Sequence, residues 1–284
     1  MTMLYLVPSV VGLLIGALGL LRLWDWNAER VEWDRLLSTQ PQSPAWFDPA
    51  MTAGLPEAAR RYFAYSIAPG TPLFPIAEIE MEGQFSLKAP GYMPMKARQI
   101  LALPHGFIWK MHLVGGLPIS GSDTGSWTRF RLLGLVPVAR AGGDADHARS
   151  AFGRCVIEAI FWTPAALLPR PGVTWEEVGE NAARVTVTEG DLSQSVDVTV
   201  DDEGKPLSVT MMRWSNANPQ KRFRLQPFGG TLSDFRNVDG YRLPFSVEGG
   251  NMFGTDEYFP FYKAVVTEIR FPGFPTTERT PVEK

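Results

Sequence analysis

Alternation of apolar and polar residues dominates the chain from Ile76 onward. The stretch "AEIEMEGQFSLK" alternates acidic or polar residues with apolar ones, and "GFIWKMHLV", "ARVTVTEG" and "SVDVTV" show the same period of two. This period is typical of strands with one buried face, and Gly or Pro bounds each segment. "DDEG" at 201–204 and "VDG" at 238–240 lie between such segments and predict hairpin turns. About ten to twelve strands with few intervening helices predict an antiparallel sheet.

One long segment, "DADHARSAFGRCVIEAIFWTPAALLP", interrupts the strands and predicts a helix over 145–163. Asp144 or Asp146 can cap its start, and Pro164 ends it. Arg154 and Glu158 are four residues apart, so they can form an ion pair. One face of the helix is apolar, and the other carries His147, Ser150, Arg154 and Glu158. This polar face lies either in solvent or inside a cavity of the sheet, where the ion pair would orient something polar.

The predicted fold is therefore mainly β, of the α+β class, with a curved antiparallel sheet or open half-barrel that wraps a central helix. We expect four parts: a transmembrane anchor at 1–24, a juxtamembrane helix and proline-rich linker at 25–54, a β-rich domain at 55–272, and a flexible tail at 273–284. The domain contains helices near 56–67 and 145–163.

The N-terminal run from Leu4 to Leu23 carries no charge before Arg22. About 20 apolar residues form a helix of roughly 30 Å, which is enough to cross a bilayer. A cleaved signal peptide usually has a basic start and a small-residue cleavage site, and this sequence has neither. Trp24 and Trp26 follow the run, where interfacial aromatic residues belong. These features favour a retained anchor over a signal peptide or a buried core helix.

The side of the membrane is predicted from basic residues. None precedes the run, whereas Arg22, Arg30 and Arg35 follow it. This places the domain in the cytoplasm of a bacterium, as a single-pass protein of the inner membrane, although so small an asymmetry leaves the periplasm open. Small residues on one helix face can admit another inner-membrane protein, or simply reflect the glycine content of membrane helices. Membrane or partner contacts are predicted at Gly12, Gly16, Gly19, Arg22, Trp24 and Trp26.

Composition argues against several kinds of chemistry. Cys155 is the single cysteine, and the three histidines lack metal-ligand spacing, so we expect no metal. No phosphate-binding or dinucleotide-binding glycine motif occurs, so we expect no cofactor. A net charge of −3 with dispersed basic residues argues against nucleic acid. Asp123-Thr124-Gly125 resembles an aspartic-protease triplet but lacks the apolar strand before it, and we interpret it as a β-turn.

Arginines and aromatic residues on the predicted strands admit two interpretations. Arginines two residues apart share a strand face, and they form either a basic patch for anionic head groups or ordinary outward-facing charge. They are Arg129, Arg131, Arg213, Arg222 and Arg224. The aromatic residues either line a cavity or fill the core. They are Phe107, Trp109, Phe161, Trp162, Trp214, Phe228 and Phe245.

Four stretches carry a resemblance to a known family: "RLLGLVPVARAGG", "GRCVIEAIFWTPAALLP", "FRLQPFGG" and "FGTDEYFPFYKAVV". Together they resemble an uncharacterised bacterial family, a domain of unknown function whose members often carry N-terminal membrane helices. The similarity runs over 55–271, and the helix with Gly153, Arg154, Glu158 and Pro164 is its most specific part. At fold level the chain looks like the LolA/LolB-like lipoprotein-carrier half-barrels. Those carriers work in the periplasm, which opposes the charge-based topology.

Three functions remain open from sequence. The preferred one is a non-catalytic, membrane-anchored β module that binds membrane lipid or another apolar ligand. The alternatives are an accessory or scaffold subunit of an inner-membrane complex, and a hydrolase using Arg154, Glu158 and His147. Ligand-binding residues are predicted at His147, Ser150, Arg154, Glu158, Trp162, Trp109 and Trp214, and no catalytic or metal-binding residue is assigned.

Overall fold

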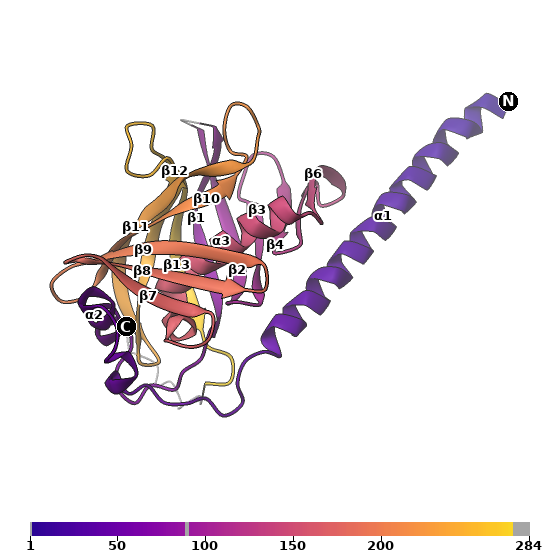
Figure 1. Cartoon of the computed structure of the whole chain (residues 1–284). Helices are drawn as coiled ribbons and strands as arrows, with labels where there is room; N and C mark the ends of the chain where they lie inside the picture. Colours follow the sequence, from indigo (N-terminus) through magenta and orange to yellow (C-terminus); the bar gives the residue numbers. More distant parts are fainter. Residues whose placement is uncertain (1, 89–90, 275–284) are drawn as a thin grey trace, which may run out of the picture.

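A computed structural model describes residues 2–88 and 91–274 of the chain (Figure 1). Its helices are α1 (Thr2–Leu37), α2 (Glu57–Ser66) and α3 (Ala145–Trp162), with short 3₁₀ turns at Pro49–Thr52 and Pro164–Leu167. The strands are β1 (Ile76–Lys88), β2 (Gly91–Ala102), β3 (Gly106–Leu113), β4 (Ile119–Thr124), β5 (Trp127–Leu132), β6 (Val136–Gly142), β7 (Val173–Gly179), β8 (Ala182–Glu189), β9 (Leu192–Val200), β10 (Pro206–Ser215), β11 (Arg224–Val238), β12 (Tyr241–Asn251) and β13 (Phe259–Arg270).

All thirteen strands form one antiparallel sheet in the order β6-β5-β4-β3-β2-β1-β13-β12-β11-β10-β9-β8-β7. Every neighbouring pair is consecutive in the chain except one, β1 with β13, which joins the first strand to the last. The sheet stays open, with β6 and β7 at its two edges. The predicted mainly β fold, a curved antiparallel sheet around a helix, is confirmed.

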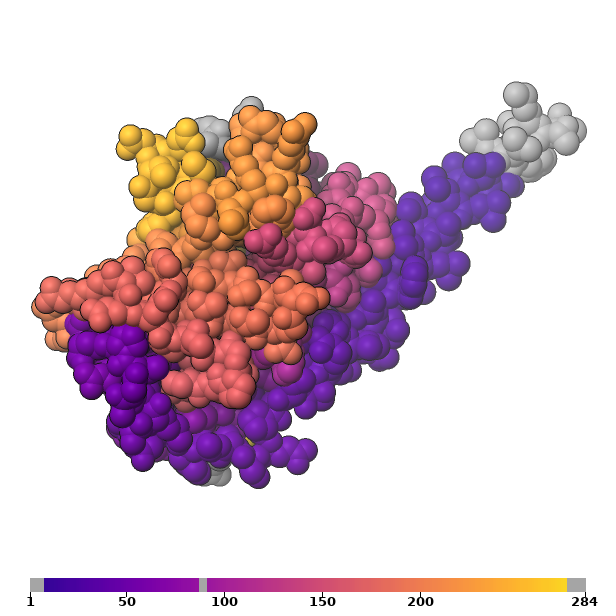
Figure 2. Space-filling model, viewed as in Figure 1, coloured from indigo at the N-terminus to yellow at the C-terminus, as the bar shows by residue number. Residues whose placement is uncertain are grey.

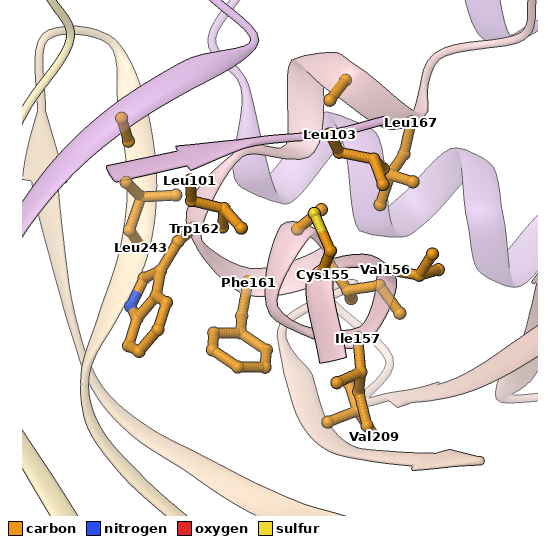
Figure 3. Packing of buried hydrophobic residues seen from close by; sticks show 14 of the residues in the cluster. Leu101, Leu103, Cys155, Val156, Ile157, Phe161, Trp162, Leu167, Val209 and Leu243 are labelled. Carbon is orange, nitrogen blue, oxygen red and sulfur yellow. The ribbon is translucent and has the colours of Figure 1, made fainter. Parts of the chain in front are cut away.

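The central helix α3 lies in the concave side of the sheet. Of the two candidate caps, Asp144 caps the helix, since its side chain accepts a hydrogen bond from the backbone N–H of His147 at 2.7 Å, and Asp146 lies in the first turn. From Ala151 to Trp162 every residue except Arg154 is buried. Figure 3 shows Ile157 pointing toward Val209 of β10 and Trp162 beside Leu243 of β12. The helix is therefore buried nearly all round, and not along a single stripe, because the sheet curves around it.

Gly153 of α3 faces the side chain of Gln194 on β9. A Cβ atom at this position would lie 2.9 Å from the side-chain oxygen of Gln194. The C-terminal end of α3 contacts α2, because the hydroxyl of Tyr62 on α2 donates a hydrogen bond to the carbonyl of Ile160 on α3 at 2.5 Å. The hydrogen bond from Tyr62 helps to fix the helix that carries Arg154 and Glu158.

The N-terminal helix runs without a break across the predicted boundary at residues 24 and 25. Its C-terminal half packs on the convex face of the sheet, where Leu36 joins a buried cluster with Ile76, Ile100, Ala102 and Ile108. Its N-terminal half projects beyond the domain (Figures 1 and 2). The segment Pro8–Leu37 includes a window of mean hydropathy 1.4, long and apolar enough to span a membrane. Most of the predicted tail at 273–284 lies outside the described residues.

Candidate ligand-binding cavity

A cavity of about 600 Å³ lies between α3 and the concave face of the sheet. Pockets for small molecules typically occupy about 300–1,000 Å³ and are mostly apolar with a few polar groups. The apolar lining includes Phe85, Met93, Trp109, Met111, Leu113, Ile119, Phe130, Ile157, Phe161, Trp162, Val209, Phe228, Val247, Phe261 and Tyr262. The polar side chains of the lining include Asp123, Thr128, Arg154, Glu158 and Arg213. The cavity therefore suits a largely apolar ligand.

Arg154 is the centre of the polar part of the lining. Its Nε donates to Oε1 of Glu158 at 2.7 Å, and its Nη1 donates to Oδ2 of Asp123 at 2.8 Å. Gln99 of β2 completes the group, because its Nε2 donates to Oε2 of Glu158 at 2.5 Å. The guanidinium lies over the rings of Phe107 and Trp109, at 4.6 and 5.0 Å from their centroids. The predicted ion pair between Arg154 and Glu158 is confirmed.

Charge balance keeps Arg154 ionised. Burial lowers the pKa of this guanidinium, but the carboxylates of Glu158 and Asp123 raise it more, so the pKa stands above its ordinary value. Burial raises the pKa of the Tyr262 hydroxyl and the Cys155 thiol, so both groups stay neutral at physiological pH. The carboxylates are engaged with arginine and glutamine, an arrangement that holds structure and leaves no free general base in this group.

Arg213 of β10 lines the same cavity, but no carboxylate of the described residues pairs with it. Its guanidinium lies over the Phe228 ring at 4.8 Å from the centroid. Among the described residues it has no hydrogen bond or ion pair, and its Nε is buried without a partner. Burial, followed by the positive charge of Arg154, lowers the pKa of Arg213 to about 10. It is thus a cation in an apolar setting without a carboxylate of its own.

Four of the seven predicted ligand-binding residues line the cavity, namely Arg154, Glu158, Trp109 and Trp162. The other three belong to the first turns of α3 or to the rim. His147 Nε2 lies 3.1 Å from the carbonyl oxygen of Thr124. Trp214 Nε1 donates to Asp146 at 2.8 Å, and the Arg149 guanidinium lies 4.2 Å from the ring centroid. Ser150 is partly exposed, because α3 enters the concavity only from Ala151.

The interpretation of Asp123-Thr124-Gly125 as a β-turn is wrong for its first two residues. Asp123 and Thr124 end strand β4, Gly125 lies in the connection to β5, and Asp123 pairs with Arg154. The sequence pattern does not predict strand β4, because "ISGSDT" has small and polar residues in place of clear alternation. Neither interpretation of the strand arginines, a basic patch or outward-facing charge, describes all of them. Arg213 lines the cavity, whereas Arg129 and Arg131 pair with Asp25 of α1 on the convex face.

The convex face holds α1 through two buried acidic residues, which lie in the segment predicted to be a juxtamembrane helix and linker. Asp25 pairs with Arg129 at 2.8 Å, with Arg140 at 2.6 Å, and with Arg131. One turn along the helix, Glu29 accepts a hydrogen bond from Ser122 at 3.0 Å and pairs with Lys110 at 3.1 Å. Both carboxylates are buried. A possible signal was the spacing of the two acids, four residues apart on one helix face.

The cavity lies toward one end of the sheet. Its lining includes Leu113, the last residue of β3, and Ile119, the first residue of β4, beside the loop at 114–118. The turn between β5 and β6 lies at the same end, because neighbouring strands are antiparallel. Followed from its C-terminus to its N-terminus, helix α1 runs along the sheet toward this end. Leu36, near the C-terminus of α1, contacts Ile76, the first residue of β1, at the opposite end of the sheet. Asp25, nearer the N-terminus, pairs with Arg131, the second-last residue of β5. The apolar half of α1 therefore leaves the sheet at the cavity end.

Comparisons with known proteins place the chain in a family without assigned activity. A family model described as "Family of unknown function (DUF6544)" matches residues 45–264. Among curated proteins, no sequence matches the chain.

Among solved structures, a LolA superfamily protein from Nitrosomonas europaea has a TM-score of 0.41 at 10% identity, over 77% of this chain and 93% of that one. A putative outer membrane lipoprotein-sorting protein domain from Vibrio parahaemolyticus has a TM-score of 0.34 at 10% identity, over 69% and 85%. The predicted resemblance to an uncharacterised family is confirmed. Similarity at these TM-scores says nothing about function.

Proposed function

The chain belongs to the DUF6544 family, and we propose that it is a non-catalytic, membrane-anchored module that binds a lipid-like or apolar ligand in the cavity beside α3. One observation carries this proposal: a mostly apolar cavity of about 600 Å³ lies at the sheet end toward which the apolar half of α1 runs. The alternative of a hydrolase loses support, because Arg154 and Glu158 are paired with each other and His147 contacts a backbone carbonyl.

Retention of α1 is supported by its packing. Asp25, Glu29 and Leu36 are at most 2% exposed, so the second half of the helix is part of the folded domain. Cleavage inside this half would remove the partner of three arginines and uncover the cluster around Ile100. A helix that is both membrane-spanning and packed on the sheet would also fix the orientation of the cavity relative to the bilayer.

Exposed apolar side chains at the cavity end support contact with the membrane. The loop at 114–118 and the β5–β6 hairpin present Val114, Leu117, Leu133, Leu135, Val136 and Val138, which are 38–68% exposed. Val138 also lines the cavity. A rim of this kind fits a surface that dips into head groups, with Trp24 and Trp26 at the same level of α1.

The test is to purify the full chain from membranes in mild detergent and identify bound lipid by mass spectrometry. We expect lipid at up to one equivalent for each chain. A matched pair of variants makes the test specific: Ile119→Trp fills the cavity mouth, whereas Leu207→Trp adds the same ring to an exposed position on β10. Lipid that is absent from the folded wild type, or present equally in both variants, would contradict the proposal.

A partner in the membrane remains a second candidate. A Cβ atom added at Gly12, Gly16 or Gly19 would meet nothing within 4 Å, so this face is open to another helix. The test is to compare proteins cross-linked to the wild type and to a Gly12→Leu, Gly16→Leu double variant. An unchanged set of cross-linked partners would show that this glycine face does not bind another helix.

The side of the membrane is proposed as cytoplasmic, from Arg22, Arg30 and Arg35. A cysteine at Lys284 can report it, because the native Cys155 is buried. We expect a membrane-impermeant maleimide to label this cysteine only after the cells are lysed. Labelling in cells with a permeable outer membrane and an intact inner membrane would place the domain in the periplasm.

A further inference from the structure

One cation in the cavity, Arg213, has no hydrogen-bonding or carboxylate partner in the part of the chain that the structure describes. Arg213 faces the concave side of β10 together with Val209, and both line the cavity. Its Nε is buried without a hydrogen bond, and among the described residues no carboxylate pairs with its guanidinium. Leaving a buried charge unpaired is costly, so a guanidinium in this state is expected to have a ligand that the protein itself does not supply.

Arg154, the other arginine of the cavity, has hydrogen-bond partners for its guanidinium. Arg154 uses its donors on Glu158, Asp123 and Gln99, at 2.7, 2.8 and 3.4 Å. Its positive charge also lies close enough to lower the pKa of Arg213. The carboxylates of the cavity are thus paired with Arg154, whereas Arg213 lines the same cavity without a paired carboxylate among the described residues.

The rest of the lining around Arg213 is suited to hydrocarbon. Phe228 lies under the guanidinium, and Gly229 and Gly230 follow it on β11 as part of the cavity wall. Phe261 lies within stacking distance of Phe228, with ring centroids 6.2 Å apart. Arg213 is two residues from the end of β10, at the sheet end where the cavity lies. A ligand held here can place a charged head on Arg213 and an apolar chain among the aromatic rings.

We propose that Arg213 binds the anionic head of the ligand, so that the ligand class is an amphiphile with one apolar chain region and a carboxylate or phosphate head. This inference rests on the proposed lipid-binding function and narrows it. The fork of a guanidinium matches both kinds of anion bidentately. Charge-assisted hydrogen bonds are stronger in a poorly solvated site than in water, which gives a preference for the anionic amphiphile over a neutral one of equal chain length.

The experiment uses the full chain in detergent, stripped of bound lipid, and measures displacement of a fluorescent fatty-acid probe. The competitors are oleate, oleyl alcohol and oleyl phosphate, which share one chain, together with acetate and inorganic phosphate, which have none. For the wild type we expect oleate or oleyl phosphate to bind about 10- to 100-fold more tightly than the alcohol. The stronger of the two identifies the head group, and the chainless anions should not compete at the same concentrations.

Substitutions of Arg213 test whether this residue causes the preference for the anionic amphiphile. Arg213→Gln should remove the preference while the alcohol still binds, and Arg213→Lys should retain part of it. Arg224→Gln, at an exposed arginine on the neighbouring strand, should behave like the wild type. A melting curve of each variant shows that it is folded.

Failure of the inference about Arg213 and failure of the proposed lipid-binding function give different results. If acid and alcohol bind equally, or Arg213→Gln keeps the preference, the role of Arg213 is overturned and the lipid-binding function stands. Competition by acetate or phosphate alone would also overturn the inference, because the site would then take a free anion. If neither amphiphile displaces the probe from folded wild-type protein, the proposed function itself fails.

Discussion

Asp25 of α1 and Arg131 of β5 form an ion pair in which the two side chains are 1% and 2% exposed. Arg129 and Arg140 pair with the same carboxylate, so one acid of the N-terminal helix is bound by three arginines of the sheet. This contact makes α1 part of the domain and orients the apolar half of the helix relative to the cavity.

Asp25→Ala is expected to destabilise the domain. Removing one member of a buried ion pair typically costs about 3–5 kcal/mol, because the remaining charge is left without compensation. Here three guanidinium groups would lose their shared partner. The measurement is a denaturant or thermal unfolding curve in detergent. Asp34→Ala, at an exposed aspartate of the same helix, is the control and should change stability little. Equal stability of the two variants would show that the Asp25 cluster does not hold α1.

Replacing the two cavity arginines by methionine is expected to have opposite effects on stability. Arg154→Met leaves Asp123 and Glu158 without their cation and should cost about 3 kcal/mol or more at neutral pH. Arg213→Met removes a charge that has no partner and should stabilise the ligand-free protein, by about 1–2 kcal/mol after allowance for partial exposure. Thermal unfolding in detergent measures both. Destabilisation by Arg213→Met would mean that its charge is compensated in the ligand-free protein.

The stabilising effect of Arg213→Met should not depend on pH between 6 and 9. Burial lowers the pKa of Arg213 from its ordinary 12.5 to about 10, so the unfolded chain binds more protons only between these two values. Stability of the wild type therefore rises with pH across that alkaline window and is unaffected by this group below it. Unfolding of the wild type and Arg213→Met at pH 6, 7.5 and 9 checks this. A difference that shrinks between pH 6 and 9 would place the pKa of Arg213 lower than stated.

The β5–β6 hairpin is expected to lie at the level of the lipid head groups. Leu133 is 68% exposed at its tip, whereas Val178 is 47% exposed on β7 at the far edge of the sheet. In liposomes, a fluorophore on Leu133→Cys should be quenched by lipids that carry a quencher near the head group, and one on Val178→Cys should not. The native thiol does not interfere, because Cys155 is buried and burial raises its pKa. Equal quenching at both sites would contradict this orientation.

Much of the fold and part of the site could be predicted from local patterns. Period-two alternation predicts antiparallel strands, Asp144 and Pro164 bound the central helix, and the spacing of Arg154 and Glu158 predicts their ion pair. Each of these depends on residues close together in the chain, for which helix and strand geometry is the same in every protein. The apolar run before Arg22 likewise predicts a long apolar helix from composition alone.

Tertiary structure alone decided which charges meet. Asp25 and Arg140 are 115 residues apart, and Asp123 and Arg154 are 31 apart, so no local spacing relates them. Arg131 and Arg213 look alike in sequence, yet one is paired against α1 on the convex face and the other is unpaired in the cavity. The physical reason is the curvature and register of the sheet, which are set by packing of thirteen strands around α3 and not by any one strand. The sequence by itself therefore determined the strands, the central helix and the apolar N-terminal helix, and the folded sheet determined which arginine is left to bind a ligand.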